Sequence, residues 1–361
     1  MSALLQAAVP GAETPLYATQ PGDVVRDREE VLGVWQDHFG PRGIQGAKFD
    51  HFYRENRYGP PILQLLRHLP TGALVGVIGA GPRPFLCRGR PIRAGVVAHF
   101  AVDEKHRSLG PALMLQESLI DAARGRFDLL YGLPRSNAVA VSKRAGFHVM
   151  GTLVRHARVL RHGEYLRRRM PAFLASSSGL LIDLGRRLRT GAADSLFSEL
   201  QWEWVSASDE RMDALWREAL HTEALTSVRD HALLRWRFDT PPAGRAHYLL
   251  VSGKDGRLRA WFACEVSVGQ GGPLTVMDYW STDAMIGIGR PLIRALISAA
   301  DQQGCSAVHL LLTASDPAMA GWRSEGFVPR SEQPLIGLWL TPQRMPEEAT
   351  QLHVTMLDQD G

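Results

Sequence analysis

Residues 101–115 read AVDEKHRSLGPALML, and this stretch decides how the chain is interpreted. An apolar run at 96–102 is typical of a buried strand, and polar residues then lead into leucines 113, 115 and 119 with helical spacing. Pro111 suits a helix entrance, because a proline in the first turn lacks only an N–H group that would be free anyway. We therefore predict a strand, a tight turn and a helix. The free N–H groups of such a turn bind anions, most often phosphates.

Composition limits the class of protein. The 361 residues are enough for two domains, and 45% hydrophobic with 22% charged residues is typical of a globular protein. The formal charge of +4 is mildly basic and does not indicate a nucleic-acid partner, so none is expected. Cys87, Cys264 and Cys305 are too scattered for a disulfide framework or a zinc site, so no metal is expected. Without a signal-peptide pattern or an apolar run of about 18 residues, a cytoplasmic location is expected.

The surroundings of the first turn recur downstream in the same order. Three pairs of segments repeat at shifts of between 177 and 181 residues: Arg28–Trp35 with 209–216, Leu115 and Leu119 with Leu292 and Leu296, and Gly146-Phe147 with Gly326-Phe327. His51-Phe52-Tyr53 is matched by Trp236-Arg237-Phe238 at a shift of 185. Agreement in order and spacing predicts a duplicated chain.

Each half has the same predicted succession of elements. An amphipathic helix (27–39; 208–219) precedes an aromatic loop and a hairpin (62–69 with 74–80; 248–252 with 258–266). A buried strand (96–102; 274–280), the turn and helix, and a last strand (127–133; 307–312) follow. The predicted class is α+β, with two tandem domains that each have a mixed, mostly antiparallel sheet flanked by helices. The predicted boundaries are a first domain at 14–168, a basic linker helix at 169–198, a second domain at 199–345 and a tail at 346–361.

The turn carries a family resemblance. Arg107-Ser108-Leu109-Gly110-Pro111-Ala112 resembles the Q/R-x-x-G-x-G/A motif of the GNAT superfamily of acyl-CoA N-acyltransferases at its three fixed positions. The order of elements is similar to that superfamily over nearly the whole chain, as two copies. The loops HFYRENRYGPP (51–61) and LRWRFDTPPAG (234–244) further resemble tandem GNAT proteins of bacterial exopolysaccharide and surface-lipid gene clusters.

The resemblance implies a coenzyme site. Amides of the turn 107–112 would hold the pyrophosphate of acetyl-CoA or another acyl-CoA, and the strand edge near Val102 would pair with pantetheine. Arg107 either contacts the phosphates or pins the turn, and Pro111 removes one amide from the cradle. Asn137 either contacts the coenzyme or caps the following short helix. In the second copy Ala284 stands where the motif has Arg or Gln, so we expect the first copy to bind the coenzyme.

Acyl transfer to an amine also needs a general base. His99 and Asp278 stand at matching positions of the two buried strands, 179 residues apart. His99 is the preferred base, with Glu104, Asp103 and Asp278 as alternatives; the competing interpretation of His99 is a hydrogen-bonded core residue. The family's usual acid, a tyrosine four residues before Gly-Phe, is replaced by Ser142 and Trp322.

The segment between the halves is basic. Residues 155–189 contain nine arginines against Glu164 and Asp183, and leucines 180, 181, 184 and 188 share one helical face. That pattern suits peripheral contact of 167–189 with an anionic membrane, or a bridging helix with a solvated basic face.

We therefore expect an acyl-CoA-dependent N-acyltransferase that transfers an acyl group, in the first instance acetyl, to an amine. The resemblance implies an amino sugar of surface polysaccharide synthesis as the acceptor, whether free or part of a glycolipid. The alternatives are a long-chain lipid N-acyltransferase at the membrane surface and a non-catalytic acyl-CoA-binding or scaffolding protein.

Overall fold

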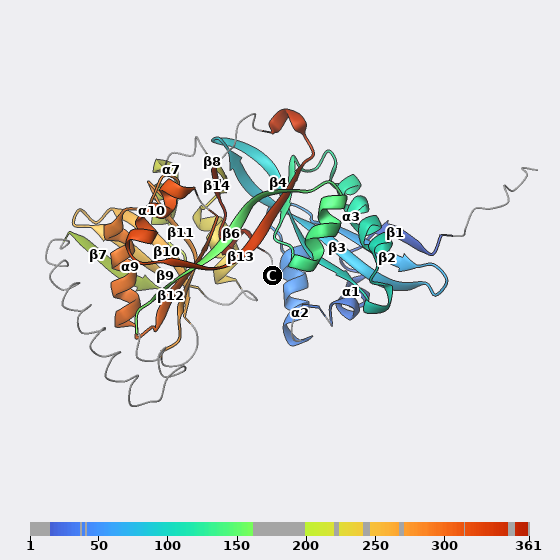
Figure 1. The fold of residues 1–361 in the computed structure, drawn as a ribbon, viewed down its shortest axis with the longest axis horizontal. Coiled ribbons are helices and arrows are strands. Elements are labelled where there is room, and N and C mark those ends of the chain that lie inside the picture. Colours follow the sequence, from blue (N-terminus) through green and yellow to red (C-terminus); the bar gives the residue numbers. More distant parts are fainter. Residues whose placement is uncertain are drawn as a thin grey trace, which may run out of the picture.

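A computed structural model of the chain describes residues 15–36, 38–39, 42–161, 199–219, 224–240, 246–266, 271–313, 315–345 and 351–359. Two halves lie side by side and are joined by strands that run through the centre of the molecule (Figure 1). The predicted α+β class, with a mostly antiparallel sheet flanked by helices, is confirmed.

The first half begins with an edge strand and two helices and continues into a long hairpin. Its elements are β1 (Tyr17–Pro21), α1 (Arg28–Trp35), α2 (Arg42–Phe49), η1 (Asp50–Arg54), β2 (Ile62–His68), β3 (Ala73–Cys87), β4 (Arg90–Val102), η2 (Glu104–His106), α3 (Leu109–Ala123), β5 (Leu129–Gly132), η3 (Ser136–Ala138), α4 (Val139–Arg144) and β6 (His148–Val159).

The second half follows the same order, with a short additional strand after its first helix and a C-terminal extension. Its elements are β7 (Leu200–Val205), α7 (Arg211–Glu218), β8 (Ala224–Ser227), α8 (His231–Leu234), η4 (Arg235–Asp239), β9 (His247–Gly253), β10 (Leu258–Val266), β11 (Leu274–Ser281), α9 (Arg290–Gln302), β12 (Ala307–Leu312), α10 (Asp316–Ser324), β13 (Val328–Trp339), η5 (Pro342–Arg344), β14 (Gln351–His353) and η6 (Met356–Asp358).

The halves exchange their last long strands. The sheet order is β1-β2-β3-β4-β5-β13-β6-β12-β11-β10-β9-β7, so β13 of the second half pairs with β5 and β6 of the first half pairs with β12. At the centre β6 and β13 pair with each other in antiparallel fashion. Within the described residues, neither half completes its sheet without a strand from the other. The predicted boundaries around 169–198, and the proposed membrane-contact segment from 167 to 189, lie outside the described residues.

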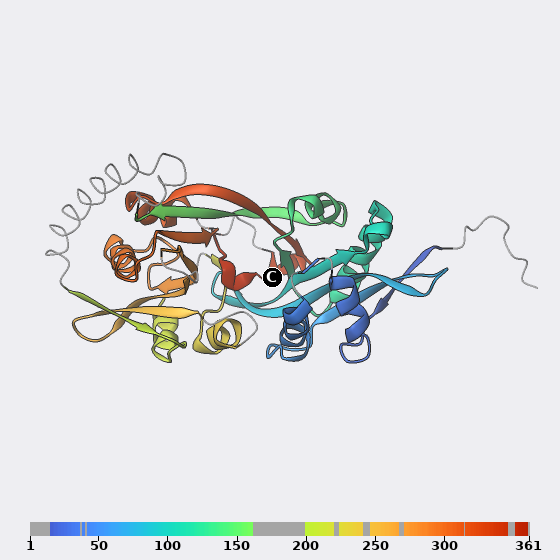
Figure 2. The same ribbon diagram turned by 90° about the horizontal axis from the view of Figure 1, so that it is seen from below.

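Helices cover both faces of the first half's sheet (Figure 2). On one face α3 packs its buried Leu115 and Leu119 against Ile78 of β3. On the other face α1 and η1 bring Trp35 and Phe52 into a second cluster. Because successive residues of a strand point to opposite faces, β3 and β4 contribute to both clusters.

Residues 351–359, which lie within the predicted tail, pack into the core. Strand β14 pairs with β8 in parallel, and β8 pairs with the far end of β3 at Phe85–Cys87. Val354 and Leu357 are each 1% exposed, in the hydrophobic clusters of the first and second half respectively. The C-terminal segment 351–359 therefore belongs to the junction between the halves.

Asp128 fastens the exchanged strand β13 to the first half. Its fully buried carboxylate accepts hydrogen bonds from the backbone and side chain of Arg93 and from the Thr341 hydroxyl. Its carbonyl accepts from Leu340 N–H at 2.8 Å. Burial by itself raises the pKa of Asp128, but these hydrogen bonds outweigh it and hold the pKa at about 2.

We expect Asp128→Asn to lower the free energy of unfolding by about 1–2 kcal/mol at pH 7. The reason is that a carboxyl group whose pKa is lower in the folded state stabilises the fold at every pH above its pKa in the unfolded state. Half of Arg93 is exposed, which screens part of the effect. That contribution disappears as the pH falls from about 4 towards about 2. Urea denaturation at pH 7 and pH 3 measures it, with the exposed Asp121→Asn as the control. An equal loss at both pH values would contradict the assignment.

Candidate functional site

The turn after β4 is held to the end of that strand. Asp103 N–H donates to Val75 O at 2.8 Å, and the Asp103 carboxylate accepts from Lys105 N–H at 2.9 Å. The Arg107 guanidinium donates through Nε and Nη2 to Val102 O, both at 3.4 Å. Of the two roles predicted for Arg107, the structure therefore shows the pinning of the turn.

The start of α3 is open to solvent. Ser108, Leu109 and Gly110 are exposed, and Ser108 is an extended N-cap without a side-chain cap. The first N–H groups of a helix have no partner within it, so those of Leu109 and Gly110 are free to bind an anion. A Cβ atom built on Gly110 meets nothing within 4 Å. Pro111, which lacks an N–H group, is buried, and Ala112 N–H already donates to Ser108 O at 3.4 Å.

Beside this turn β4 and β5 diverge. Their parallel pairing ends at Val96 and Tyr131, whereas β4 continues to Val102. Asn137 lies exposed in η3 after β5, at the same edge of the sheet as the turn. The N-cap residue of α4 is Ala138, so the alternative role of Asn137 as its cap is not what the structure shows. The predicted coenzyme residues thus meet at one sheet edge; coenzyme contact itself stays a prediction.

The corresponding turn of the second half is closed. There α9 begins only after Gly289, while Ala284 and Ile288 in the preceding turn are buried. Gly287 has φ +140°, and a Cβ atom on it would lie 3.1 Å from a backbone oxygen of α10. A Cβ atom on Gly321 of α10 would lie 2.5 Å from Ile288 O, so α10 packs directly on this turn.

The interior behind the two turns also differs. In the first half the Gln116 amide donates to Ser142 Oγ at 3.0 Å, and Ser142 Oγ donates to Ala138 O at 3.1 Å. The buried Gln116 Oε1 has no hydrogen-bond partner in the described residues. In the second half the equivalent space is filled by Trp322, which is 0% exposed and packs on Tyr279. Gln116 was not predicted as a site residue. The sequence feature that could have indicated it is a polar residue on the apolar face of a helix.

His99 occupies a bulge in β4. Two residues of β4, His99 and Phe100, lie opposite a single residue of β3. His99 has φ +58°, a left-handed conformation that is uncommon for a residue with a side chain. Bulges of this kind often lie next to active sites, where they re-aim a side chain. In β11 the register shifts next to Asp278: Asp278 pairs with Ala263 and Val276 with Cys264, so Met277 between them has no partner in β10.

Aromatic rings surround the His99 imidazole. The ring of Trp35 is centred 4.3 Å away, and the ring of Phe52 stands at 88° to the imidazole at 4.7 Å. His99 Nδ1 lies 3.3 Å from the Tyr53 hydroxyl. This hydroxyl occupies the space above Gly79, where a Cβ atom would be 2.1 Å from it, so only glycine fits there. His99 is therefore oriented by its neighbours and is 9% exposed.

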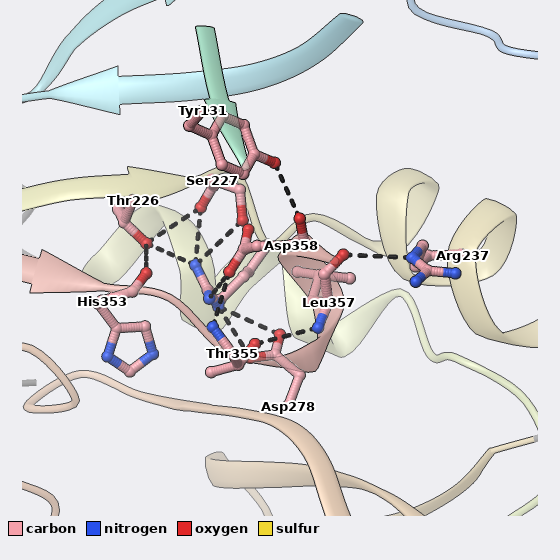
Figure 3. Close-up of polar contacts among 10 residues, drawn as sticks. Tyr131, Thr226, Ser227, Arg237, Asp278, His353, Thr355, Leu357 and Asp358 are labelled. Atoms are coloured by element: carbon pink, nitrogen blue, oxygen red, sulfur yellow. Dashed lines mark hydrogen bonds and ion pairs between the residues drawn. The ribbon is translucent and has the colours of Figure 1, made fainter. Parts of the chain in front are cut away.

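Asp278 lies in a closed ionic cluster (Figure 3). Its carboxylate is 3.1 Å from Arg229 and accepts from the Thr355 hydroxyl at 2.8 Å, and Arg229 also contacts Asp358 at 3.3 Å. All three charged side chains are 0% exposed. Burial raises the pKa of Asp278 to about 6, against the lowering effect of Arg229. The matching strand positions thus have different surroundings, and Asp278 faces the C-terminal segment rather than solvent.

The remaining predicted residues are placed as follows. Glu104 lies exposed on η2, beyond the end of β4. Of the aromatic loops, His51 stacks on Trp236 at 4.7 Å, and Tyr58 meets the same ring edge-on at 5.9 Å. These loops pack the two halves against each other.

In the described part of the chain, no group of three or more His, Cys, Asp or Glu residues is arranged so that it could hold a metal ion. No helix among these residues is long and apolar enough to cross a membrane.

Comparison with known proteins identifies the fold. Neither a family model nor a curated protein matches the sequence. The structure is similar to a GCN5-related N-acetyltransferase from Anabaena variabilis, with a TM-score of 0.61 and 12% identity over 90% of this chain and 73% of that one. A second such protein, from Kribbella flavida, has a TM-score of 0.57 and 14% identity over 91% of this chain and 72% of that one. N-myristoyltransferase of Saccharomyces cerevisiae, solved with myristoyl-CoA, has a TM-score of 0.52 and 13% identity over 92% and 81%. At these identities the similarity shows that the chain has the GNAT fold.

Proposed function

We propose that the chain is an acyl-CoA-dependent N-acyltransferase, built as a tandem duplication, with its thioester site in the first half. The observation that carries this proposal is the exposed start of α3 at the point where β4 and β5 diverge, with open space at Gly110. The second half has the same topology, but its turn is covered by α10 and its interior is filled by Trp322. The shared GNAT fold supports the same reaction class.

The residues of the turn would hold the coenzyme. The N–H groups of Leu109 and Gly110, with the positive end of the α3 dipole, suit the pyrophosphate. Arg107 fixes the turn by contacting Val102 O and leaves part of its guanidinium for a phosphate oxygen. The coenzyme supplies the activated acyl group as a thioester, and an acetyl group is the proposed acyl group.

His99 is the proposed general base. In the tautomer in which Nδ1–H donates to the Tyr53 hydroxyl, Nε2 carries the lone pair that accepts the proton of the amine, directly or through water. Loss of this proton leaves a neutral amine, whose nitrogen attacks the thioester carbonyl to form the C–N bond. The C–S bond then breaks to release coenzyme A as the thiolate, and the nitrogen gives up its second proton to form the amide. Glu104 is the exposed alternative base; Asp278 would need the C-terminal segment to move. With Ser142 and Trp322 at the usual tyrosine position, no acid is assigned to the leaving thiolate.

The acceptor proposed from the sequence resemblance is the amine of an amino sugar for surface polysaccharide, free or on a glycolipid. The competing proposal is a long-chain lipid N-acyltransferase, favoured by the similarity to N-myristoyltransferase solved with myristoyl-CoA and by the basic segment 167–189. A third is a non-catalytic acyl-CoA-binding or scaffolding protein, favoured by the missing tyrosine. Mass spectrometry of the purified protein separates them through what it retains: acetyl-CoA, a long-chain thioester or nothing.

We expect Gly110→Val to weaken coenzyme A binding about tenfold or more, because its side chain would enter the open space where the pyrophosphate approaches the amides. Gly289→Val is the matched control, since Gly289 is the N-cap residue of α9 and its Cβ atom would meet only a proline carbon at 3.7 Å. Gly287 is unsuitable because its φ of +140° strains any side chain. Isothermal titration calorimetry measures both variants. Equal losses of coenzyme A affinity in the two variants, or a larger loss for Gly289→Val, would contradict the placement of the coenzyme site in the first half.

We expect His99→Ala to remove most of the rate together with the acidic limb of the pH–rate profile, because a protonated imidazole cannot accept the proton of the amine. Coenzyme A affinity should change little, since the turn is separate from the bulge. The exposed His148→Ala is the control. The measurements are kcat against pH at saturating acceptor and the melting temperature. If the variant melts at a lower temperature but its pH–rate profile keeps the acidic limb, His99 is a core residue and Glu104 becomes the proposed base.

A further inference from the structure

The β3–β4 hairpin is basic at the end far from His99. Residues 82–94 include Arg83, Arg88, Arg90 and Arg93 and contain no aspartate or glutamate. This run of positive charge lies on a hairpin whose other end carries the proposed acyl-transfer site. The proposed function does not use it.

A cavity of about 410 Å³ opens at this basic end. It lies between the loop before β2, the outer parts of β3 and β4, and the loop after α3. Its lining residues are Tyr58, Gly59, Pro60, Pro82, Arg83, Pro84, Ile92, Arg93, Ala94, Arg126 and Phe127. The volume is in the range of small-molecule sites, and the lining combines apolar rings with arginines and no carboxylate.

The cavity is separate from the proposed acyl-transfer site. Pro82 and Pro84 alternate along β3 with Arg83, and they therefore share the face of Ile78, which packs under α3. His99 is surrounded by the rings that cover the opposite face. The cavity also adjoins residues 92–94, at the start of β4, whereas the turn follows its end at Val102.

Two guanidinium groups of the wall are held in place by carbonyl groups. Arg93 donates to Asp128 and to Gly125 O, and Arg126 donates to the carbonyl of Pro60, which also lines the cavity. An arginine has five N–H donors, so both retain donors for a ligand. Asp128 neutralises Arg93 but is fully buried and does not line the cavity, which leaves Arg126 as a positive charge on the wall.

Tyr58 lines the cavity but does not supply a donor to it. Its hydroxyl is buried away from accessible space, so a ligand in the cavity does not reach this group.

We propose that this cavity is a second ligand site, which takes a small molecule with a phosphate or carboxylate group on a compact apolar body. Arginine forks match both oxyanions, and the proline rings with Phe127 offer the apolar contact. The site is independent of the proposed acyl transfer and would bind its ligand with or without coenzyme A.

Titration calorimetry with phenyl phosphate on the full chain tests this proposal. We expect saturable binding that weakens with added salt, and no binding of benzyl alcohol, which has the ring without the anion. Arg126→Gln should weaken phenyl phosphate binding about tenfold, the loss expected for one charge-assisted contact. Arg124→Gln, two residues away and paired with Asp121 outside the lining, should leave it unchanged.

A second variant and a competition experiment with coenzyme A complete the test. If Arg126→Gln lowers the melting temperature, Arg126→Lys replaces it, and a loss of affinity on removal of the guanidinium fork supports the site. Saturating coenzyme A should leave phenyl phosphate binding unchanged, whereas competition would assign the binding to the α3 turn and overturn the proposal. Absence of binding, or equal losses for the Arg126 and Arg124 variants, would also overturn it.

Discussion

The exchange of β6 and β13 is the constraint on which the rest of the structure depends. An unpaired strand edge leaves a row of N–H and C=O groups without partners, so the short strand β5 needs a neighbour on each side. It pairs with β4 over only three residues and with β13 over four. Because β13 holds β5 from the other side, β4 can leave it after Val96 and still continue to Val102. The point where β4 and β5 diverge, at which we place the thioester, thus lies beside a strand that the other half supplies.

The two halves show how one topology is used in two ways. Both have diverging parallel strands, a bulge and a following helix. In the second half, apolar burial of Ile288 and Trp322 stabilises the closed turn. In the first half, the Gln116–Ser142 pair keeps polar atoms inside, including an acceptor without a partner, which destabilises the fold unless something binds there. At this one position the first half therefore keeps a buried polar pair, whereas the second half fills the space with the ring of Trp322.

The C-terminal segment gives the second half a different chemistry at its bulge. Arg229 lies between Asp278 and Asp358, all without exposure to solvent. Removal of one member of such a cluster leaves an uncompensated buried charge, which is strongly destabilising. The Tyr131 hydroxyl of β5 donates to Asp358 O at 3.0 Å, so the same segment also reaches the strand that borders the first half's opening. The C-terminal segment therefore contacts both β5 of the first half and the Asp278 region of the second half, and it encloses the carboxylate that sequence matching pairs with His99.

The sequence by itself determined most of the elements and their order, because these depend on neighbours two to four residues apart. The strands β6, β8, β13 and β14 were not predicted. The hairpin predicted at 248–252 and 258–266 is found at His247–Gly253 and Leu258–Val266, and the buried strand at 274–280 is β11 (Leu274–Ser281). The turn at 107–112 likewise follows from a local pattern of glycine, proline and leucine. Only the tertiary structure decided which half receives β6 and β13, that 351–359 is core, and that Asp278 faces Arg229 and Thr355. These outcomes depend on contacts between residues 49 to 227 positions apart, for which periodicity along the chain carries no signal.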